Sequence, residues 1–182
     1  MNEKLLNLVL SALMAALTCI ATMIIRIPTP ALGYIHFGDG MVLLSGILLG
    51  PVYGTLAAGI GSMFADIFSG YMGFAPATLI IKALAAFAGG TVYHLIIKSF
   101  SRNEKKILGT IAGGLSGGLV VIAGYYLFSA LFLGMGFLAA LTDIPFNLVQ
   151  TAFGIAGASL LLPVMDKVPL IKERLYAGHS RY

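Results

Sequence analysis

Charged residues are scarce in this chain of 182 residues: Asp, Glu, Lys and Arg make up only 10% of it, whereas hydrophobic residues make up 59%. A soluble domain usually carries about 25% charged residues, so there are too few here to cover a surface that faces water. The low charge also excludes a disordered chain, and the single Cys19 excludes a disulfide scaffold. The length is short for a two-domain enzyme. The composition therefore indicates an integral membrane protein.

Long stretches without charge predict where the chain crosses the membrane. A spanning helix needs roughly 20 apolar residues, because the hydrocarbon core is about 30 Å thick. Gly50-Pro51 interrupts one such stretch, and proline disfavours a continuous helix, so we divide this stretch into two. The sequence thus predicts an all-α integral membrane protein with a single domain, residues 1–182, and six transmembrane helices. The predicted spans are about 4–26, 39–50, 52–68, 76–99, 107–133 and 143–166.

The basic residues predict the orientation of this bundle. They gather at the two ends of the chain and between the fourth and fifth spans, at Lys4, Lys98, Arg102, Lys105, Lys106, Lys167, Lys172 and Arg174. The three loops on the opposite side contain no Lys or Arg, although Arg26 borders the first of them. Positively charged loops stay inside, so both termini are expected to be cytoplasmic and the chain to be a multi-pass protein of the cell membrane. The net charge of +4 then reflects orientation, and we expect no nucleic-acid partner.

Three ionisable residues lie within or beside the apolar spans: Asp66, Lys82 and Asp143. Such groups are costly in lipid and usually face the bundle interior or a wet cavity. The proposed topology brings all three toward the outer side. We favour a structural ion pair between Asp66 and Lys82 that fixes the packing of adjacent helices. The alternative is that Lys82 meets an oxygen of a substrate.

The last span carries the most specific polar pattern. Asp143, Asn147 and Gln150 are spaced i, i+4, i+7, which places them on one face of a helix. A carboxylate and two amides supply both donors and acceptors, as recognition of a heteroaromatic ring with nitrogens and hydroxyls requires. We favour a ligand-binding face. The alternative is that these residues join neighbouring helices, with Asp143 serving only as a helix N-cap.

Aromatic residues gather in two of the outer loops. Tyr34 and His36 lie in the first loop, which prolines 28 and 30 are expected to stiffen, and Tyr71 and Phe74 lie in the second. These rings are suited to stack on a flat ligand. The alternative is that they are interfacial residues of the kind common in membrane proteins. Asp39, at the end of the first loop, is expected to be an N-cap rather than a ligand contact.

Stripes of small residues indicate where helices approach closely. Gly54, Ala58 and Gly61 form one stripe and Gly109, Gly113 and Gly117 another, both expected to pack within the bundle. Ala12 and Ala16 form a third stripe. Internal packing is the default expectation for this stripe too, and docking of another membrane protein is the more specific alternative. A phosphate-binding loop is excluded because no Gly-Lys dipeptide occurs, so the chain cannot hydrolyse ATP itself. One cysteine and three scattered histidines predict no metal or cofactor.

From about residue 5 to 166, the chain resembles the substrate-binding S components of energy-coupling-factor (ECF) vitamin transporters. The resemblance rests on five segments: Ala12–Ala16 (ALMAA), Gly33–Asp39 (GYIHFGD), Ala65–Tyr71 (ADIFSGY), Ala75–Lys82 (APATLIIK) and Pro145–Gln150 (PFNLVQ). It implies six helices, an outward-facing pocket closed by the first loop, and no enzyme activity. It also implies partners: a transmembrane coupling (T) subunit that contacts Ala12 and Ala16, and two cytoplasmic ATPase subunits.

The resemblance is strongest to the branch of riboflavin, pyridoxine and hydroxymethylpyrimidine carriers. A small pyridine or pyrimidine fits the compact polar set of the last span slightly better than a flavin with its ribityl tail, so riboflavin is the alternative substrate. The expected substrate-binding residues are Asp143, Asn147, Gln150, Lys82, Tyr34, His36, Tyr71 and Phe74. Two other classes stay open: a small membrane enzyme that uses Asp66, Lys82 and Asp143, and a channel-like bundle without saturable binding.

Overall fold

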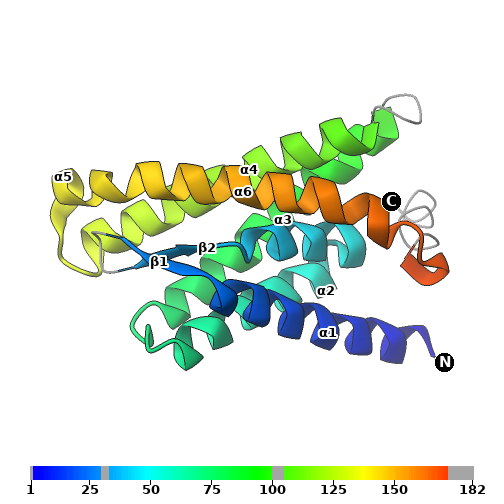
Figure 1. Ribbon diagram of the computed structural model, residues 1–182, viewed down its shortest axis with the longest axis horizontal. Helices are drawn as coiled ribbons and strands as arrows, with labels where there is room; N and C mark the ends of the chain where they lie inside the picture. The colour runs from blue at the N-terminus through cyan, green and yellow to red at the C-terminus, as the bar shows by residue number, and fades with distance from the viewer. Residues whose placement is uncertain (1, 30–32, 100–104, 172–182) are drawn as a thin grey trace.

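A computed structural model describes residues 2–29, 33–99 and 105–171 of the chain. Its helices are α1 (Glu3–Ile24), α2 (Asp39–Phe68), α3 (Ala75–Ser99), α4 (Lys105–Leu131) and α6 (Ile144–Met165), with a short α5 (Gly136–Ala140) and a 3₁₀ turn (Leu141–Asp143) before α6. These five long helices are sufficiently long and apolar to cross a membrane. Figure 1 shows them as an elongated bundle. The predicted class, a helical membrane bundle, is confirmed.

The helix α2 is broken where the sequence predicts a division. Gly50 has φ 75° and ψ −171°, a left-handed conformation that interrupts the helix, and Pro51 follows it. Glycine adopts a positive φ at little cost, whereas proline removes a backbone donor and restricts the residue before it. When its two parts are counted separately, the described residues contain six long helical segments; when α2 is counted as one helix, they contain five.

Small residues allow the helices of the core to approach closely. A Cβ atom added to Gly46 on α2 would lie 2.1 Å from the carbonyl oxygen of Ala86 on α3. A Cβ atom on Gly113 of α4 would lie 2.5 Å from the carbonyl oxygen of Gly89, also on α3. Packing of the α4 stripe within the bundle is therefore confirmed. The α2 helix lies between α1, α3 and α6 and supplies much of the buried core, including Leu44 and Ile47.

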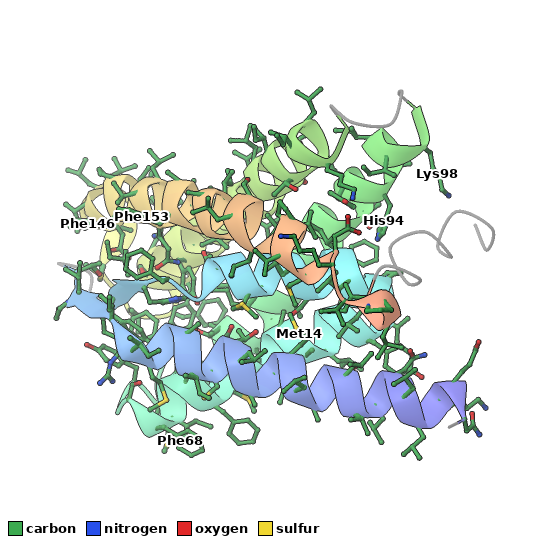
Figure 2. All side chains as sticks on the ribbon, turned by 45° about the vertical axis from the view of Figure 1, so that its right-hand side comes forward. Met14, Phe68, His94, Lys98, Phe146 and Phe153 are labelled. Atoms are coloured by element: carbon green, nitrogen blue, oxygen red, sulfur yellow. The ribbon has the colours of Figure 1, made fainter. Side chains whose placement is uncertain are left out.

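Both ends of the described chain lie at the same end of the bundle. In Figure 1, α1 begins and α6 ends at the right, whereas α5 and the strands lie at the left. His94 and Lys98 lie toward the end of the bundle opposite Phe68 and Phe146 (Figure 2). This arrangement agrees with an even number of crossings, and that this end is cytoplasmic stays a prediction. Arg102, Lys172 and Arg174, on which that prediction partly rests, lie outside the described residues.

The first outer loop forms a small hairpin, which adds a two-stranded sheet to the predicted all-helical fold. The strand β1 (Arg26–Pro28) pairs antiparallel with β2 (Tyr34–His36), so that Arg26 faces His36 and Pro28 faces Tyr34. The first helix ends at Ile24, because Ile25 is already extended and leads into β1. Pro30, expected to stiffen this loop, lies outside the described residues.

Candidate functional site

A cavity lies between the hairpin and the ends of the helices next to it. The empty space there, including the part that is open to solvent, is about 390 Å³. Six of the eight residues expected to bind substrate line it: Tyr34, His36, Phe74, Asp143, Asn147 and Gln150. They come from β2, the loop before α3, and the start of α6. The structure thus brings together the aromatic loop residues and the polar residues of the last span.

The polar face of α6 is joined to the hairpin. Gln150 is buried, and its Oε1 accepts a hydrogen bond from the backbone N–H of His36 at 3.0 Å. Three residues earlier, Asn147 lies in the cavity wall and its side-chain amide donates to the carbonyl oxygen of Asp143 at 3.2 Å. Gln150 therefore anchors the hairpin over the cavity, and Asn147 is the amide of this face that is best placed to meet a ligand.

Lys82 makes a different ion pair from the one expected. Its Nζ lies 2.5 Å from Oδ1 of Asp39, and the side chains of both residues are buried. The same ammonium group lies 5.3 Å from the centre of the Tyr125 ring. The expected pair with Asp66 is wrong, because the ammonium group pairs with Asp39 in the first turn of α2 instead. Lys82 does not line the cavity; it contacts Asp39, which in turn binds the cavity residue Gln150.

Asp39 is also not the N-cap that the sequence indicated. Gly38 occupies the N-cap position, and α2 begins at Asp39. The Asp39 carboxylate points into the bundle, where Oδ1 accepts from Lys82 and Oδ2 accepts from Gln150 Nε2 at 2.9 Å. The proposed N-cap role of Asp143 is also not supported by the geometry, because Asp143 precedes α6 but its side chain makes no capping hydrogen bond.

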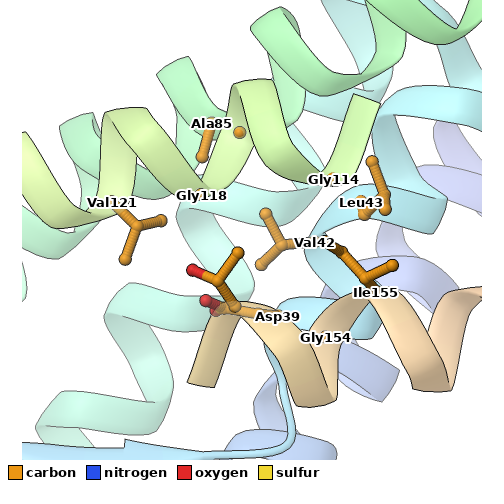
Figure 3. Close-up of a pocket in the computed structure, with 11 residues that line it drawn as sticks. Asp39, Val42, Leu43, Ala85, Gly114, Gly118, Val121, Gly154 and Ile155 are labelled. Atoms are coloured by element: carbon orange, nitrogen blue, oxygen red, sulfur yellow. The ribbon is translucent and has the colours of Figure 1, made fainter. Parts of the chain in front are cut away.

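Asp39 also borders a second, mostly apolar cavity of about 300 Å³ between α2, α4 and α6. Figure 3 shows its carboxylate directed toward the gap between α4 and α6. Glycines at the contact keep this gap narrow: a Cβ atom on Gly118 would lie 2.2 Å from Cγ2 of Thr151. The Asp39–Gln150 hydrogen bond thus joins residues that line two neighbouring cavities.

The environment of His36 keeps its imidazole neutral. Burial, together with the positive charge of Lys82, lowers the pKa of His36 to about 3. The neutral Nδ1 accepts a hydrogen bond from the backbone N–H of Gly38 at 3.0 Å, which shapes the turn between β2 and α2. Protonation of Nδ1 would remove this acceptor. His36 is therefore a structural part of the hairpin as well as a residue of the cavity wall.

Tyr34 also lies in the cavity wall. Its hydroxyl donates to Oδ1 of Asp66 at 2.6 Å, and burial and the charge of Asp66 raise the pKa of Tyr34. The Tyr34 ring lies 4.4 Å from the ring of Tyr71, measured between centres. Tyr71 is not among the residues that line the cavity, so it contacts the ring of Tyr34 but not the cavity itself.

The cavity wall also contains residues that the sequence pattern did not predict. Thr29, Thr78 and Tyr125 border the cavity, and the side-chain oxygens of Thr78 and Tyr125 lie 2.9 Å apart. Thr78 precedes Lys82 by one helical turn, so the i, i+4 spacing could have found it. Tyr125 lies in an apolar, glycine-containing span with no comparable signal.

Ala12 and Ala16 lie on the exposed side of α1. The face of α1 that packs against the bundle carries Ser11, Met14, Thr18 and Thr22 instead. The close approach of α1 to α2 is made by Ala15 and Gly61, since a Cβ atom on Gly61 would lie 2.3 Å from the Ala15 carbonyl oxygen. The default expectation that Ala12 and Ala16 pack within the bundle is therefore wrong.

Comparison with known proteins identifies the family to which this arrangement belongs. Residues 2–167 match the family model described as the S component of the ECF-type riboflavin transporter. The chain belongs to this family. The predicted resemblance is thus confirmed, and the protein is a multi-pass membrane subunit of an ECF-type transporter rather than an enzyme.

Two further proteins are similar to this S component. An uncharacterized protein of Pyrococcus woesei, described as lying in a gap 3′ region, is 35% identical over 137 residues, which are 75% of this chain and 85% of that protein. A solved structure of the S component of a bacterial ECF transporter superposes with a TM-score of 0.66, over 91% of this chain and 99% of that chain. Its sequence identity is 22%, so this likeness establishes the fold alone.

Proposed function

We propose that this S component captures a flat heteroaromatic vitamin from outside the cell in the cavity beneath the hairpin. The observation that carries the proposal is the meeting of two complementary surfaces in that cavity. The aromatic residues Tyr34 and Phe74 form one part of the wall, and the polar residues Asn147 and Asp143 of the last span form another. Small-molecule sites typically combine such aromatic surfaces with a few placed polar groups.

Riboflavin is the first substrate to test, because the matching family model is that of riboflavin transporters. A pyridoxine-type vitamin or hydroxymethylpyrimidine is the second candidate, because the polar set of α6 is compact. All of these present ring nitrogens and hydroxyl or carbonyl groups that amide and carboxylate side chains recognise.

The test is a binding titration of the purified protein in detergent. Riboflavin binding is followed by quenching of flavin fluorescence, and the binding of pyridoxine and hydroxymethylpyrimidine is followed by calorimetry. Mass spectrometry identifies any small molecule that co-purifies. We expect saturable binding of one of these compounds and its release in unchanged form. Saturable binding of none of them would contradict the proposal.

Mass spectrometry of the released compound also checks the enzyme alternative, which membership of this family already opposes. An enzyme that used Asp66, Lys82 and Asp143 would return a converted product. The pairing of Lys82 with Asp39 opposes that alternative, because it holds the ammonium group behind the cavity wall.

We further propose that the loaded protein delivers its vitamin inward by docking to a T subunit that is driven by two cytoplasmic ATPase subunits. Support comes from Ala12 and Ala16, which leave a small-residue surface exposed on α1. Small residues at i, i+4 allow another helix to approach closely within a membrane.

A further inference from the structure

One carboxylate oxygen in the cavity wall has no hydrogen-bond partner within the described structure. Asp66 is 4% exposed, and its Oδ1 accepts the hydroxyl of Tyr34, but Oδ2 accepts nothing. Because the hydroxyl of Tyr34 donates to Oδ1 at 2.6 Å, Oδ2 is the oxygen of this carboxyl group that a ligand donor would meet. An unsatisfied, buried acceptor is costly and uncommon, and a ligand donor is one way to satisfy it.

The cavity also contains no compensating cation among its described lining residues. Asp66 and Asp143 contribute two carboxyl groups to the wall, and none of the described lining residues is Lys or Arg. Lys82 is engaged by Asp39. Arg26 is exposed on β1 and does not line the cavity. The charge balance of the wall is therefore negative, which favours ligands that donate hydrogen bonds and disfavours anions.

We infer that Asp66 is a specificity-determining residue of this site: its free Oδ2 accepts an N–H or O–H group of the vitamin, and its charge excludes the phosphorylated form of the same vitamin. This inference rests on the proposed function. It adds a polar contact on the α2 side of the ligand, opposite the amides of α6. A site built in this way takes a neutral or cationic ring compound and rejects its phosphate ester.

The test compares each vitamin with its phosphate ester on the same protein. Riboflavin is paired with riboflavin 5′-phosphate, pyridoxine with pyridoxine 5′-phosphate, and hydroxymethylpyrimidine with its phosphate ester. Each compound is titrated against wild-type protein and Asp66→Asn. Asn keeps the shape of Asp and an oxygen that can accept from Tyr34, but it removes the charge. Asp166→Asn is the matched control, because it makes the same change of charge on a partly exposed residue that pairs with Lys106 at the end of α6.

We expect the wild-type protein to bind the vitamin at least about tenfold more tightly than its phosphate ester. Asp66→Asn should weaken binding of the vitamin by about tenfold or more, the range for loss of a hydrogen bond to a charged group. The same substitution should also reduce the ratio between the affinity for the vitamin and the affinity for its phosphate ester. Asp166→Asn should change neither the affinity for the vitamin nor this ratio.

Three results would count against these ideas, and they are distinguishable. If none of riboflavin, pyridoxine and hydroxymethylpyrimidine binds to wild-type protein, the proposed function fails. If a vitamin binds but its phosphate ester binds equally well, or if Asp66→Asn binds both as the wild type does, the role of Asp66 is overturned. Thermal melting and gel filtration check that the variant folds. If the variant does not fold, the decision rests on the wild-type protein alone. Binding of the vitamin at least about tenfold more tightly than its phosphate ester supports the inference, and equal binding of the two overturns it.

Discussion

Among individual residues, Asp39 connects several elements around the candidate site. Its two carboxylate oxygens accept from Lys82 of α3 and Gln150 of α6, and Gln150 in turn accepts from the backbone of His36 in β2. One buried carboxylate thus ties three helices and the hairpin together. Removing one partner of a buried ion pair leaves an uncompensated charge, which is more costly than replacing both partners.

The Lys82–Asp39 pair gives the first prediction. Lys82→Met and Asp39→Asn should each lower the free energy of unfolding by about 3–5 kcal/mol, because each leaves one buried charge unpaired. The free energy of unfolding of the double variant should fall by less than the sum of the losses in the two single variants. Thermal unfolding in detergent measures these effects as a double-mutant cycle. Lys106→Met is the control, since its partly exposed pair with Asp166 should contribute about 1 kcal/mol or less. Additive losses would contradict a direct pair.

The amide of Asn147 gives the second prediction. Asn147 is buried in the cavity wall, so Asn147→Ala should weaken vitamin binding by about 1–3 kcal/mol through loss of its hydrogen bonds. The dissociation constant from the fluorescence or calorimetric titration measures the change. The neighbouring substitution Leu148→Ala serves as control, because Leu148 is exposed on the outside of α6. If Asn147→Ala binds the vitamin with unchanged affinity, Asn147 serves only the packing of the helices.

At the scale of elements, the hairpin is the part of the site that depends most on its neighbours. Each strand has three residues, and an isolated two-stranded hairpin is marginally stable at best. The hairpin is held by the hydrogen bonds of His36 to Gln150 and of Tyr34 to Asp66. Because these anchors come from α6 and α2 respectively, the hairpin can cover the cavity only when both helices are in place.

The third prediction concerns the pH dependence of this anchoring. His36 has a pKa of about 3 in the folded protein and about 6.5 when unfolded. Between these values the unfolded chain binds the extra proton, so the stabilisation is complete above about pH 6.5 and is lost as the pH falls toward 3. One proton corresponds to a slope of up to about 1.4 kcal/mol per pH unit.

Melting temperatures of the wild type and of His36→Asn, measured across this pH range, test the prediction. Asn has an acceptor for the N–H of Gly38 but does not titrate here, so the variant should depend less on pH. If the melting temperatures of the two proteins depend on pH in the same way, His36 does not contribute to the pH dependence of stability.

At the scale of the whole molecule, α1 has two faces with different tasks. One face packs on α2 through Met14 and Thr18, and the other leaves Ala12 and Ala16 exposed together with large apolar residues such as Leu13. The exposed face lies on the side of α1 away from the rest of the bundle, so a partner could bind there without disturbing the cavity.

The fourth prediction tests this separation. Ala12→Trp or Ala16→Trp should abolish vitamin uptake by cells that contain the complete transporter, because a bulky ring blocks close approach of the T subunit. Vitamin affinity of the purified variant should stay near the wild-type value. Leu119→Trp is a control, since Leu119 is exposed on α4, on another helix of the bundle. Full uptake by both alanine variants would exclude this face as the docking surface.

Much of the fold follows from local features of the chain. The uncharged stretches located the long helices, and Gly50-Pro51 located the break in α2, because the conformational limits of proline act on adjacent residues. The spacing of Asp143, Asn147 and Gln150 correctly placed them on one side of α6, where all three meet the same cavity. The partner of Lys82 could not be predicted in this way, because helical periodicity does not specify how one helix is rotated against the next.

The sequence alone determined that this protein is embedded in lipid, where its long helices lie, and which residues were available to recognise a ligand. These properties depend on composition and on spacing along one helix. Only the tertiary structure decided that Asp39, rather than Asp66, neutralises Lys82, and that the hairpin rests on Gln150. Such contacts join residues more than 40 positions apart, as in the Lys82–Asp39 pair, and they exist only once several helices have packed in a particular rotation and depth.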